Sequence, residues 1–174
     1  MLILKYIMKL LKALGSEAEP WQLASGFVLG MIMGLTPLLS LHNLFFLILI
    51  LMLKVNIGMA LLGLSLFSGV AYLADPLFDQ FGFAVLTVES LNGFWTSLYN
   101  SPTIALTNFY NTVVMGSLLS GLILAIPLYP ATLKFVDLYR KHIHERVQQW
   151  KIVKALKSSK VYAIYQNVNK FRGT

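Results

Sequence analysis

The sequence contains no cysteine among its 174 residues. This absence excludes a disulfide framework, a thiolate nucleophile, a zinc–thiolate site and an iron–sulfur cluster. It also lacks a P-loop, a G-x-S-x-G motif, an H-E-x-x-H motif and a dinucleotide-binding glycine fingerprint. We therefore expect no enzymatic activity and no cofactor. His142, His144 and Glu145 are close in sequence, but helix positions two apart do not share a face, so we expect no metal site.

Charge is also scarce, because only 12% of the residues are charged, against about 25% in ordinary soluble domains. Hydrophobic residues make up 57%, and the mean hydropathy is +0.69. Residues 20–53, 55–74 and 90–133 carry no formal charge. About 20 apolar residues cross a bilayer core of about 30 Å as a helix, which satisfies its own backbone groups in lipid. The sequence therefore predicts an all-α, polytopic integral membrane protein.

The positive charges lie near the two ends of the sequence, since every Lys and Arg except Lys54 falls in residues 1–20 or 134–174. Positively charged segments favour the cytoplasmic side, so both termini are predicted to be cytoplasmic. Residues 1–15 are expected to form an amphipathic interfacial helix rather than a signal peptide, and residues 130–174 a basic cytoplasmic helical tail.

Both basic segments are expected to contact anionic lipid, which is a nearer polyanion than nucleic acid for a membrane protein. We therefore expect membrane lipids as partners and no nucleic acid. The expected lipid contacts are Lys5, Lys9, Lys12, Arg140, Lys141, Arg146, Lys151, Lys154 and Lys157.

Polar residues followed by proline predict helix starts, because a cap and a proline at the first helical position favour helix initiation. Such pairs occur at Thr36-Pro37, Asp75-Pro76 and Ser101-Pro102, with Glu19-Pro20 a weaker fourth, while Pro127 and Pro130 are expected to close the last segment. The pattern predicts a membrane domain over residues 20–128. Its parts are a hairpin (20–53), a transmembrane helix (57–74), an outer interfacial helix (76–100) and a second transmembrane helix (102–128).

The predicted hairpin has two halves, residues 20–35 and 37–53, and each is short for a bilayer crossing. We favour a re-entrant hairpin that enters and leaves on the cytoplasmic side, and two short full crossings are the alternative. Irregular backbone at membrane depth needs polar partners, or it lines a substrate path. The residues expected to supply either role are Thr36, Pro37, Ser40, His42 and Asn43.

Small residues recur at every fourth position in two predicted helices, which places them on one face and permits close approach of another helix. We expect them to pack helices together and to receive the transmembrane helix of a partner. The first series is Gly26, Gly30 and Gly34, and the second is Ser117, Gly121 and Ala125.

The stretch EPWQLASGFVLGMIMGLTPLLSLHNLFFLILILMLKVNIGMALLG carries a family resemblance. It resembles a family of small bacterial inner-membrane proteins known only as a domain of unknown function, over residues 18–75. That family has a proline, a glycine-patterned helix, a turn with proline, and a basic residue and asparagine before the next helix. The corresponding residues here are Pro20, Gly26, Gly30, Gly34, Pro37, Lys54 and Asn56.

One branch of that family, of similar length, is encoded beside a large envelope protein similar to AsmA-type lipid carriers. The resemblance therefore implies residence in the bacterial inner membrane and a periplasm-spanning lipid-transport protein as partner. Our first hypothesis is an accessory or anchor subunit of such an assembly. The alternative hypothesis is a self-contained small transporter or lipid flippase that forms a homo-oligomer, with its site at the polar hairpin.

Overall fold

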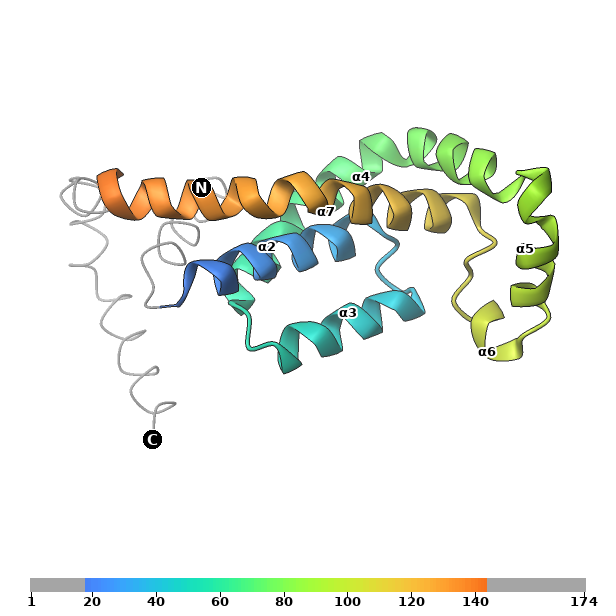
Figure 1. Cartoon of the computed structure of the whole chain (residues 1–174), viewed down its shortest axis with the longest axis horizontal. Helices are drawn as coiled ribbons and strands as arrows, with labels where there is room; N and C mark the ends of the chain where they lie inside the picture. The colour runs from blue at the N-terminus through green and yellow to red at the C-terminus, as the bar shows by residue number, and fades with distance from the viewer. Residues whose placement is uncertain (1–17, 144–174) are drawn as a thin grey trace. The chain divides into compact units, whose positions relative to one another are not determined.

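The computed structural model describes residues 18–143, and all regular structure within that range is helical. The chain divides into two compact units, residues 1–136 and 137–174. In the first unit, α2 (Pro20–Leu35), α3 (Leu41–Met52) and α4 (Ile57–Leu86) follow one another. After them come η1 (Glu89–Leu91), α5 (Asn92–Tyr99), α6 (Pro102–Ala105) and α7 (Thr112–Leu138), which are seen in Figure 1. The described part of the second unit contains the end of α7 and η2 (Tyr139–Ile143).

Helix α2 is the centre of the first unit, although it has only 16 residues. Figure 1 shows it between α3 and α7, and it also contacts α4 along its length. Residues 31–36 are all buried, so the end of α2 is covered on every side. A helix that is hydrophobic all round is stable only when it is surrounded in this way.

Glycine permits the contact between α2 and α4. A Cβ atom added to Gly26 would lie 2.6 Å from the Asn56 carbonyl oxygen, and one added to Gly34 would lie 2.6 Å from that of Leu64. At Gly30 it would overlap the Ala60 carbonyl oxygen. The partner residues in α4 increase in number with the glycines of α2, so α2 and α4 run parallel. In the sequence, α3 connects the two helices. The backbones touch, which is the close approach that small residues allow.

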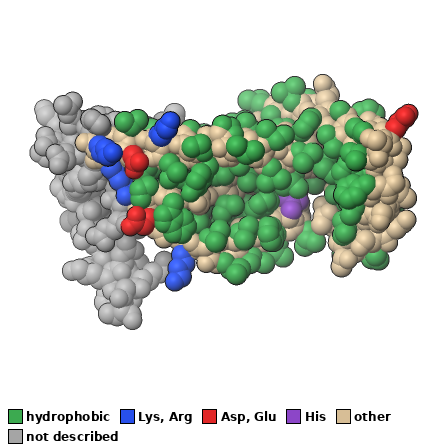
Figure 2. Space-filling model, in the orientation of Figure 1, with side chains coloured by type: hydrophobic (Ala, Val, Ile, Leu, Met, Phe, Trp, Pro, Cys, Tyr) green, Lys and Arg blue, Asp and Glu red, His purple; other side chains and the backbone are tan. Residues whose placement is uncertain are grey.

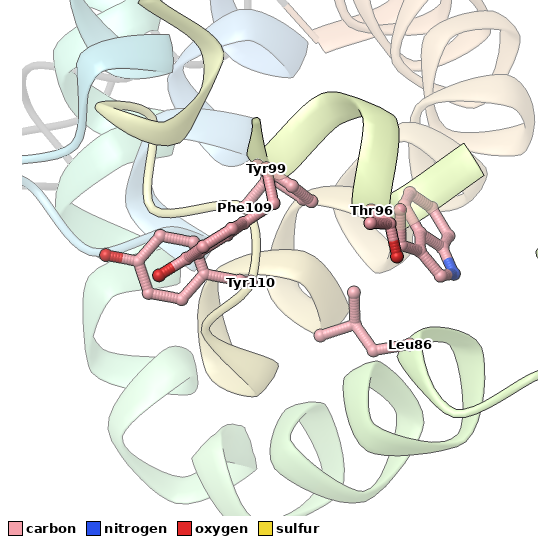
Figure 3. Close-up of a pocket in the computed structure, with 6 residues that line it drawn as sticks. Leu86, Thr96, Tyr99, Phe109 and Tyr110 are labelled. Carbon is pink, nitrogen blue, oxygen red and sulfur yellow. The ribbon is translucent and has the colours of Figure 1, made fainter. Parts of the chain in front are cut away.

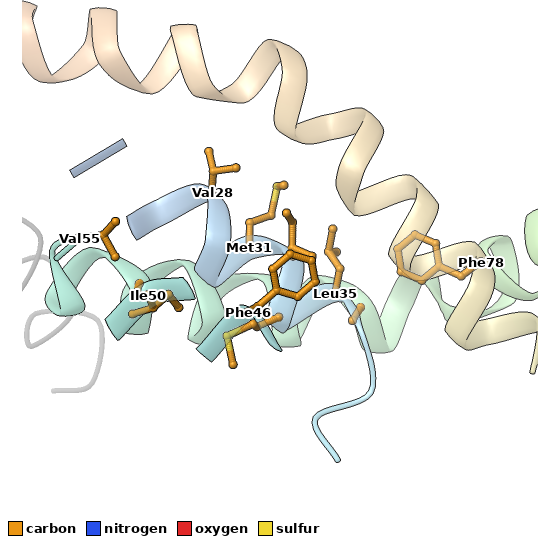
Figure 4. Close-up of a cluster of buried hydrophobic side chains, with 11 residues drawn as sticks. Val28, Met31, Leu35, Phe46, Ile50, Val55 and Phe78 are labelled. Atoms are coloured by element: carbon orange, nitrogen blue, oxygen red, sulfur yellow. The ribbon is translucent and has the colours of Figure 1, made fainter. Parts of the chain in front are cut away.

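The apolar core lies around α2. Val28, Met31 and Leu35 of α2 pack in one cluster with Phe46 and Ile50 of α3, as Figure 4 shows. Phe78 of α4 belongs to the same cluster. Each of these side chains is less than a tenth exposed. The cluster fixes the hairpin of α2 and α3 to the longer helices.

Two described helices are long and apolar enough to cross a membrane, α4 and the helix over Thr112–Lys141. In their most apolar 18-residue stretches, only 22% and 28% of the residues are buried. The core helix of a soluble protein would be mostly buried, so this exposure favours a membrane-associated protein. On the face shown in Figure 2, hydrophobic side chains cover the middle of the molecule without a charged side chain among them.

The helix start expected at Glu19-Pro20 is confirmed, whereas the one expected at Thr36-Pro37 is wrong. Helix α2 begins at Pro20, but α3 begins only at Leu41, with Ser40 as its N-terminal cap residue. Residues 36–40 form a turn because their polar groups bond to one another, as described below.

The predicted boundary at Asp75-Pro76 is wrong, because α4 continues through Pro76 to Leu86. The interfacial helix predicted over residues 76–100 is therefore divided between the end of α4, η1 and α5. An interior proline costs about 3 kcal/mol through its missing N–H and its steric clash. Packing beyond Pro76 opposes this cost, because the helix must continue to bring Gly82 against α7.

The last membrane segment also differs from its prediction. Ser101-Pro102 starts only the four-residue α6, and the long helix α7 begins at Thr112, where Asn111 accepts the Val114 N–H at 3.1 Å. Pro127 and Pro130 do not close it, since α7 runs through both. Thr132 and Val136 are buried beyond the prolines, and this packing favours a continuous helix.

We expect Gly30→Ala to lower the free energy of unfolding by about 1–3 kcal/mol, the usual cost of overpacking. Its methyl group would meet the Ala60 backbone, which cannot move aside as a side chain can. Gly69→Ala is the matched control, because nothing lies within 4 Å of its added Cβ atom. Thermal unfolding of both variants in detergent measures the difference. Equal stability of the two would contradict the backbone contact.

Candidate functional site

The turn between α2 and α3 gathers the polar residues of the apolar hairpin. Thr36 and Asn43 are 3% exposed, and Ser40 is 9% exposed. The Thr36 hydroxyl lies 2.8 Å from Asn43 Oδ1 and 3.0 Å from the Ile32 carbonyl oxygen, either of which accepts its proton. Asn43 Nδ2 donates to the Pro37 carbonyl oxygen at 3.0 Å. One asparagine therefore ties the end of α2 to the turn and to the start of α3.

The other predicted polar residues complete this turn. The Ser40 hydroxyl donates to the Pro37 carbonyl oxygen, and the Ser40 N–H donates to the same oxygen at 3.1 Å. His42 is half-buried, and its Nε2 lies 3.1 Å from the Ser40 hydroxyl. Pro37 itself is exposed and supplies an acceptor rather than a side-chain contact. The structure brings all five predicted hairpin residues together.

These bonds have a chemical consequence. A buried polar group that lacks a partner costs about 1–3 kcal/mol, so a turn whose polar side chains are buried must satisfy its own groups. Here, side chains of the turn bond mainly to backbone carbonyls of the same turn. The arrangement is suited to holding the hairpin closed, and the proton of each hydroxyl has an acceptor within the turn.

The glycine face packs two helices together as predicted, but both helices belong to this chain. Gly26, Gly30 and Gly34 lie against the chain's own α4. This side of α2 is filled within the chain, which leaves no room there for the transmembrane helix of a partner.

The second series of small residues lies on α7. Ser117 is fully buried, and its hydroxyl donates to the Val114 carbonyl oxygen at 3.2 Å. A Cβ atom on Gly121 would lie 3.6 Å from Ile32 of α2, which is ordinary contact. Ala125 packs against the core cluster. These residues face the interior of the first unit.

Sequence reasoning missed the closest contact between α4 and α7. A Cβ atom on Gly82 would overlap the Thr112 carbonyl oxygen, and one on Gly116 would overlap that of Phe78. Thr112 also donates a hydrogen bond to Asp79 beside this crossing. The two helices run antiparallel here. Each helix contributes a single glycine to this contact, Gly82 or Gly116. A single glycine does not repeat along the sequence, so no pattern indicated the contact.

Sequence reasoning also missed the role of Gln22, which joins the start of α2 to the connection before α4. Its Oε1 accepts the Glu19 N–H at 2.9 Å, and its Nε2 donates to the Lys54 carbonyl oxygen at 3.0 Å. Its own carbonyl oxygen accepts the Asn56 N–H at 3.1 Å. The position three residues after Glu19 is that of a capping box, which could have indicated the first of these bonds.

Most of the predicted lipid contacts lie outside the described residues. These are Lys5, Lys9, Lys12, Arg146, Lys151, Lys154 and Lys157. Arg140 and Lys141 lie in η2 of the second unit.

Comparison with known proteins places the chain among bacterial proteins. The family model described as "Uncharacterized protein conserved in bacteria (DUF2062)" matches residues 4–145. A relative from Treponema pallidum (strain Nichols), named "Uncharacterized protein", is 27% identical over 145 residues, which cover 83% of this chain and 90% of the relative. No solved structure matches significantly. The predicted relation to a bacterial family of uncharacterized proteins is therefore confirmed at that level.

We expect Asn43→Ala to lower the free energy of unfolding by about 1–3 kcal/mol, because it removes a buried side chain that bonds both the Thr36 hydroxyl and the Pro37 carbonyl oxygen. His42→Ala removes a half-buried ring that contacts the Ser40 hydroxyl and should cost less. Denaturant titration of both variants in the same detergent compares them. A larger loss for His42→Ala would show that the turn is not held by Asn43.

Proposed function

This chain belongs to the bacterial family described as "Uncharacterized protein conserved in bacteria (DUF2062)", and we propose that it is an accessory or anchor subunit of an envelope lipid-transport assembly in the inner membrane. The assignment to lipid transport rests on the resemblance of residues 18–75. The role of a non-enzymatic subunit rests on the surface of α3, which is apolar, exposed and unused by the rest of the described chain.

Helix α3 carries this surface. Leu44, Phe45 and Ile48 are about half exposed, whereas Phe46 and Ile50 on the opposite side belong to the core. An exposed apolar face of this kind contacts lipid or another protein. Because the glycine face of α2 is filled by α4, we propose that the partner's transmembrane helix contacts α3.

The proposed topology follows from helix lengths. At 1.5 Å per residue, α2 is about 24 Å long and α3 about 18 Å, both less than a bilayer core of about 30 Å. Helix α4, at about 45 Å, is long enough to cross. We propose that α2 and α3 form a re-entrant hairpin, that α4 and α7 cross the membrane, and that both termini are cytoplasmic.

The self-contained transporter is the weaker candidate. A transport site at the hairpin would need polar groups free to bind a substrate. Thr36, Ser40 and Asn43 instead bond within the turn. These bonds within the turn give Thr36, Ser40 and Asn43 a structural role, which favours the anchoring function over transport.

The topology is testable because the sequence has no cysteine, so each introduced cysteine is the only one. In the re-entrant topology, Leu39→Cys at the hairpin turn lies within the membrane and should resist a membrane-impermeant maleimide from either side. Lys54→Cys should react only from the cytoplasmic side, and Ser90→Cys in η1 only from the periplasmic side. Labelling of Leu39→Cys from the periplasm would instead establish two crossings.

The partner contact is testable with a photo-crosslinking amino acid at two adjacent positions. Phe45 is 58% exposed and Phe46 is 8% exposed. After illumination of native membranes, we expect position 45 to crosslink a large protein with its own transmembrane helix, and position 46 to give far less of that product. Mass spectrometry identifies the product. A crosslink from position 45 only to lipid or to a second copy of the chain would contradict the accessory role, and the second copy would favour the transporter.

A further inference from the structure

An open, shallow cavity of about 280 Å³ lies beside α5, in the part of the first unit that joins α4 to α7. It is lined by Leu86, Trp95, Thr96, Tyr99, Phe109 and Tyr110. Figure 3 shows Tyr99, Phe109 and Tyr110 grouped together, with Leu86 and Thr96 on other sides of the cavity. Its volume is just below the about 300 Å³ at which sites for drug-sized ligands begin, so it suits a small chemical group.

The rings of the cavity form a connected set. Trp95 and Phe109 have centroids 6.2 Å apart at an interplanar angle of 31°. Tyr110 stands at 81° to Phe109 and at 78° to Tyr99, with centroid distances of 5.9 and 5.4 Å. Rings at these distances contact one another, so a ligand would meet the ring surfaces that their neighbours leave uncovered at the cavity. The face of an aromatic ring is its negative side and attracts cations.

Polar groups in the lining favour the same charge. The Tyr110 hydroxyl donates to Asn108 Oδ1 at 3.0 Å, and the Thr96 hydroxyl donates to the Asn92 carbonyl oxygen at 2.8 Å. Both hydroxyls thus retain lone pairs for a donor, while their protons are used. The indole N–H of Trp95 is buried and has no hydrogen-bond partner among the described residues. This lining suits a ligand that brings positive charge or donors.

The surrounding sequence has the complementary charge. No Lys or Arg occurs between Lys54 and Lys134, whereas Asp75, Asp79 and Glu89 fall in this interval. An anionic group such as a phosphate would therefore find no cation in residues 55–133. A cation would meet no like charge there.

We propose that this cavity binds an ammonium group, of the quaternary or primary kind found in choline and ethanolamine. Aromatic cages recognise such groups by cation–π attraction, and each ring face contributes modestly. The group can come from a zwitterionic phospholipid headgroup or from a soluble amine. The inference does not depend on the accessory role or on the identity of any partner.

The test uses the full chain with Trp21→Phe and Trp150→Phe, which leaves Trp95 as the only tryptophan, since the sequence has three. In nanodiscs made of phosphatidylglycerol alone, added choline should change the Trp95 fluorescence saturably. The neutral carbon analogue 3,3-dimethyl-1-butanol, which has the same shape, should bind at least about threefold more weakly. Equal binding of the analogue, or no saturable change with choline, overturns the proposal.

Variants separate the cavity from general effects on the fold. Tyr110→Leu removes one ring face and should raise the choline Kd by about 2- to 30-fold, whereas Tyr110→Phe keeps the ring and should retain binding. Tyr72→Leu, at an exposed tyrosine of α4 that does not line the cavity, is the matched control and should leave the Kd unchanged. An equal effect of Tyr110→Leu and Tyr72→Leu would also overturn the proposal.

Lipid composition identifies the source of the ammonium group. If a headgroup occupies the cavity, nanodiscs that contain phosphatidylethanolamine should raise the apparent choline Kd at least about threefold through competition. If the ligand is soluble, the Kd should be the same in both lipids. Both results keep the ammonium site, and they assign it to a headgroup or to a free amine respectively.

Discussion

The contact between the backbones of α2 and α4 is the constraint on which the rest of the first unit depends. Gly30 and Gly63 are reciprocal here: a Cβ atom on Gly30 would overlap the Ala60 carbonyl oxygen, and one on Gly63 would overlap that of Phe27. In the membrane location that we propose, there is little hydrophobic drive between helices, so close packing and weak Cα–H···O contacts must supply the attraction. With α4 so close, α2 can also be covered by α3 and α7, and so becomes the centre of the unit.

Because the central helix is short, the backbone groups at its end need hydrogen-bond partners inside the unit. Helix α2 stops at Leu35, in apolar surroundings where backbone groups have no water to bond. The turn supplies these partners itself, because Thr36 and Asn43 bond to each other and to carbonyl groups of residues 32–37. The glycine contact and the polar turn therefore depend on each other. The glycine contact lets α2 pack in the core of the unit, and the polar turn satisfies the backbone groups where α2 ends.

The sequence predicted the features that repeat along it and missed those that depend on single contacts. The apolar segments, the glycine period and the polar turn were visible because each involves several residues. Pro76 led to a wrong prediction of a helix boundary. The packing of Gly82 against α7 joins residues 30 or more positions apart in sequence, and it outweighs the local preference of proline for a helix end. Gln22 was missed for a similar reason, because its bonds to Lys54 and Asn56 join distant segments.

The two ends of the long helices differ in charge and in aromatic content, and this difference supports the proposed orientation in the membrane. At the start of α4 lie Lys54, which has a left-handed backbone conformation with φ of 51°, and Asn56, which caps the helix. The segment that joins α4 to α7 instead carries aromatic rings and Glu89, with no cation. Aromatic rings favour the headgroup level, and cations favour the cytoplasmic side. The charge distribution that supports the proposed orientation also leaves the segment between α4 and α7 free of positive charge, which is the condition that an ammonium-binding cavity requires.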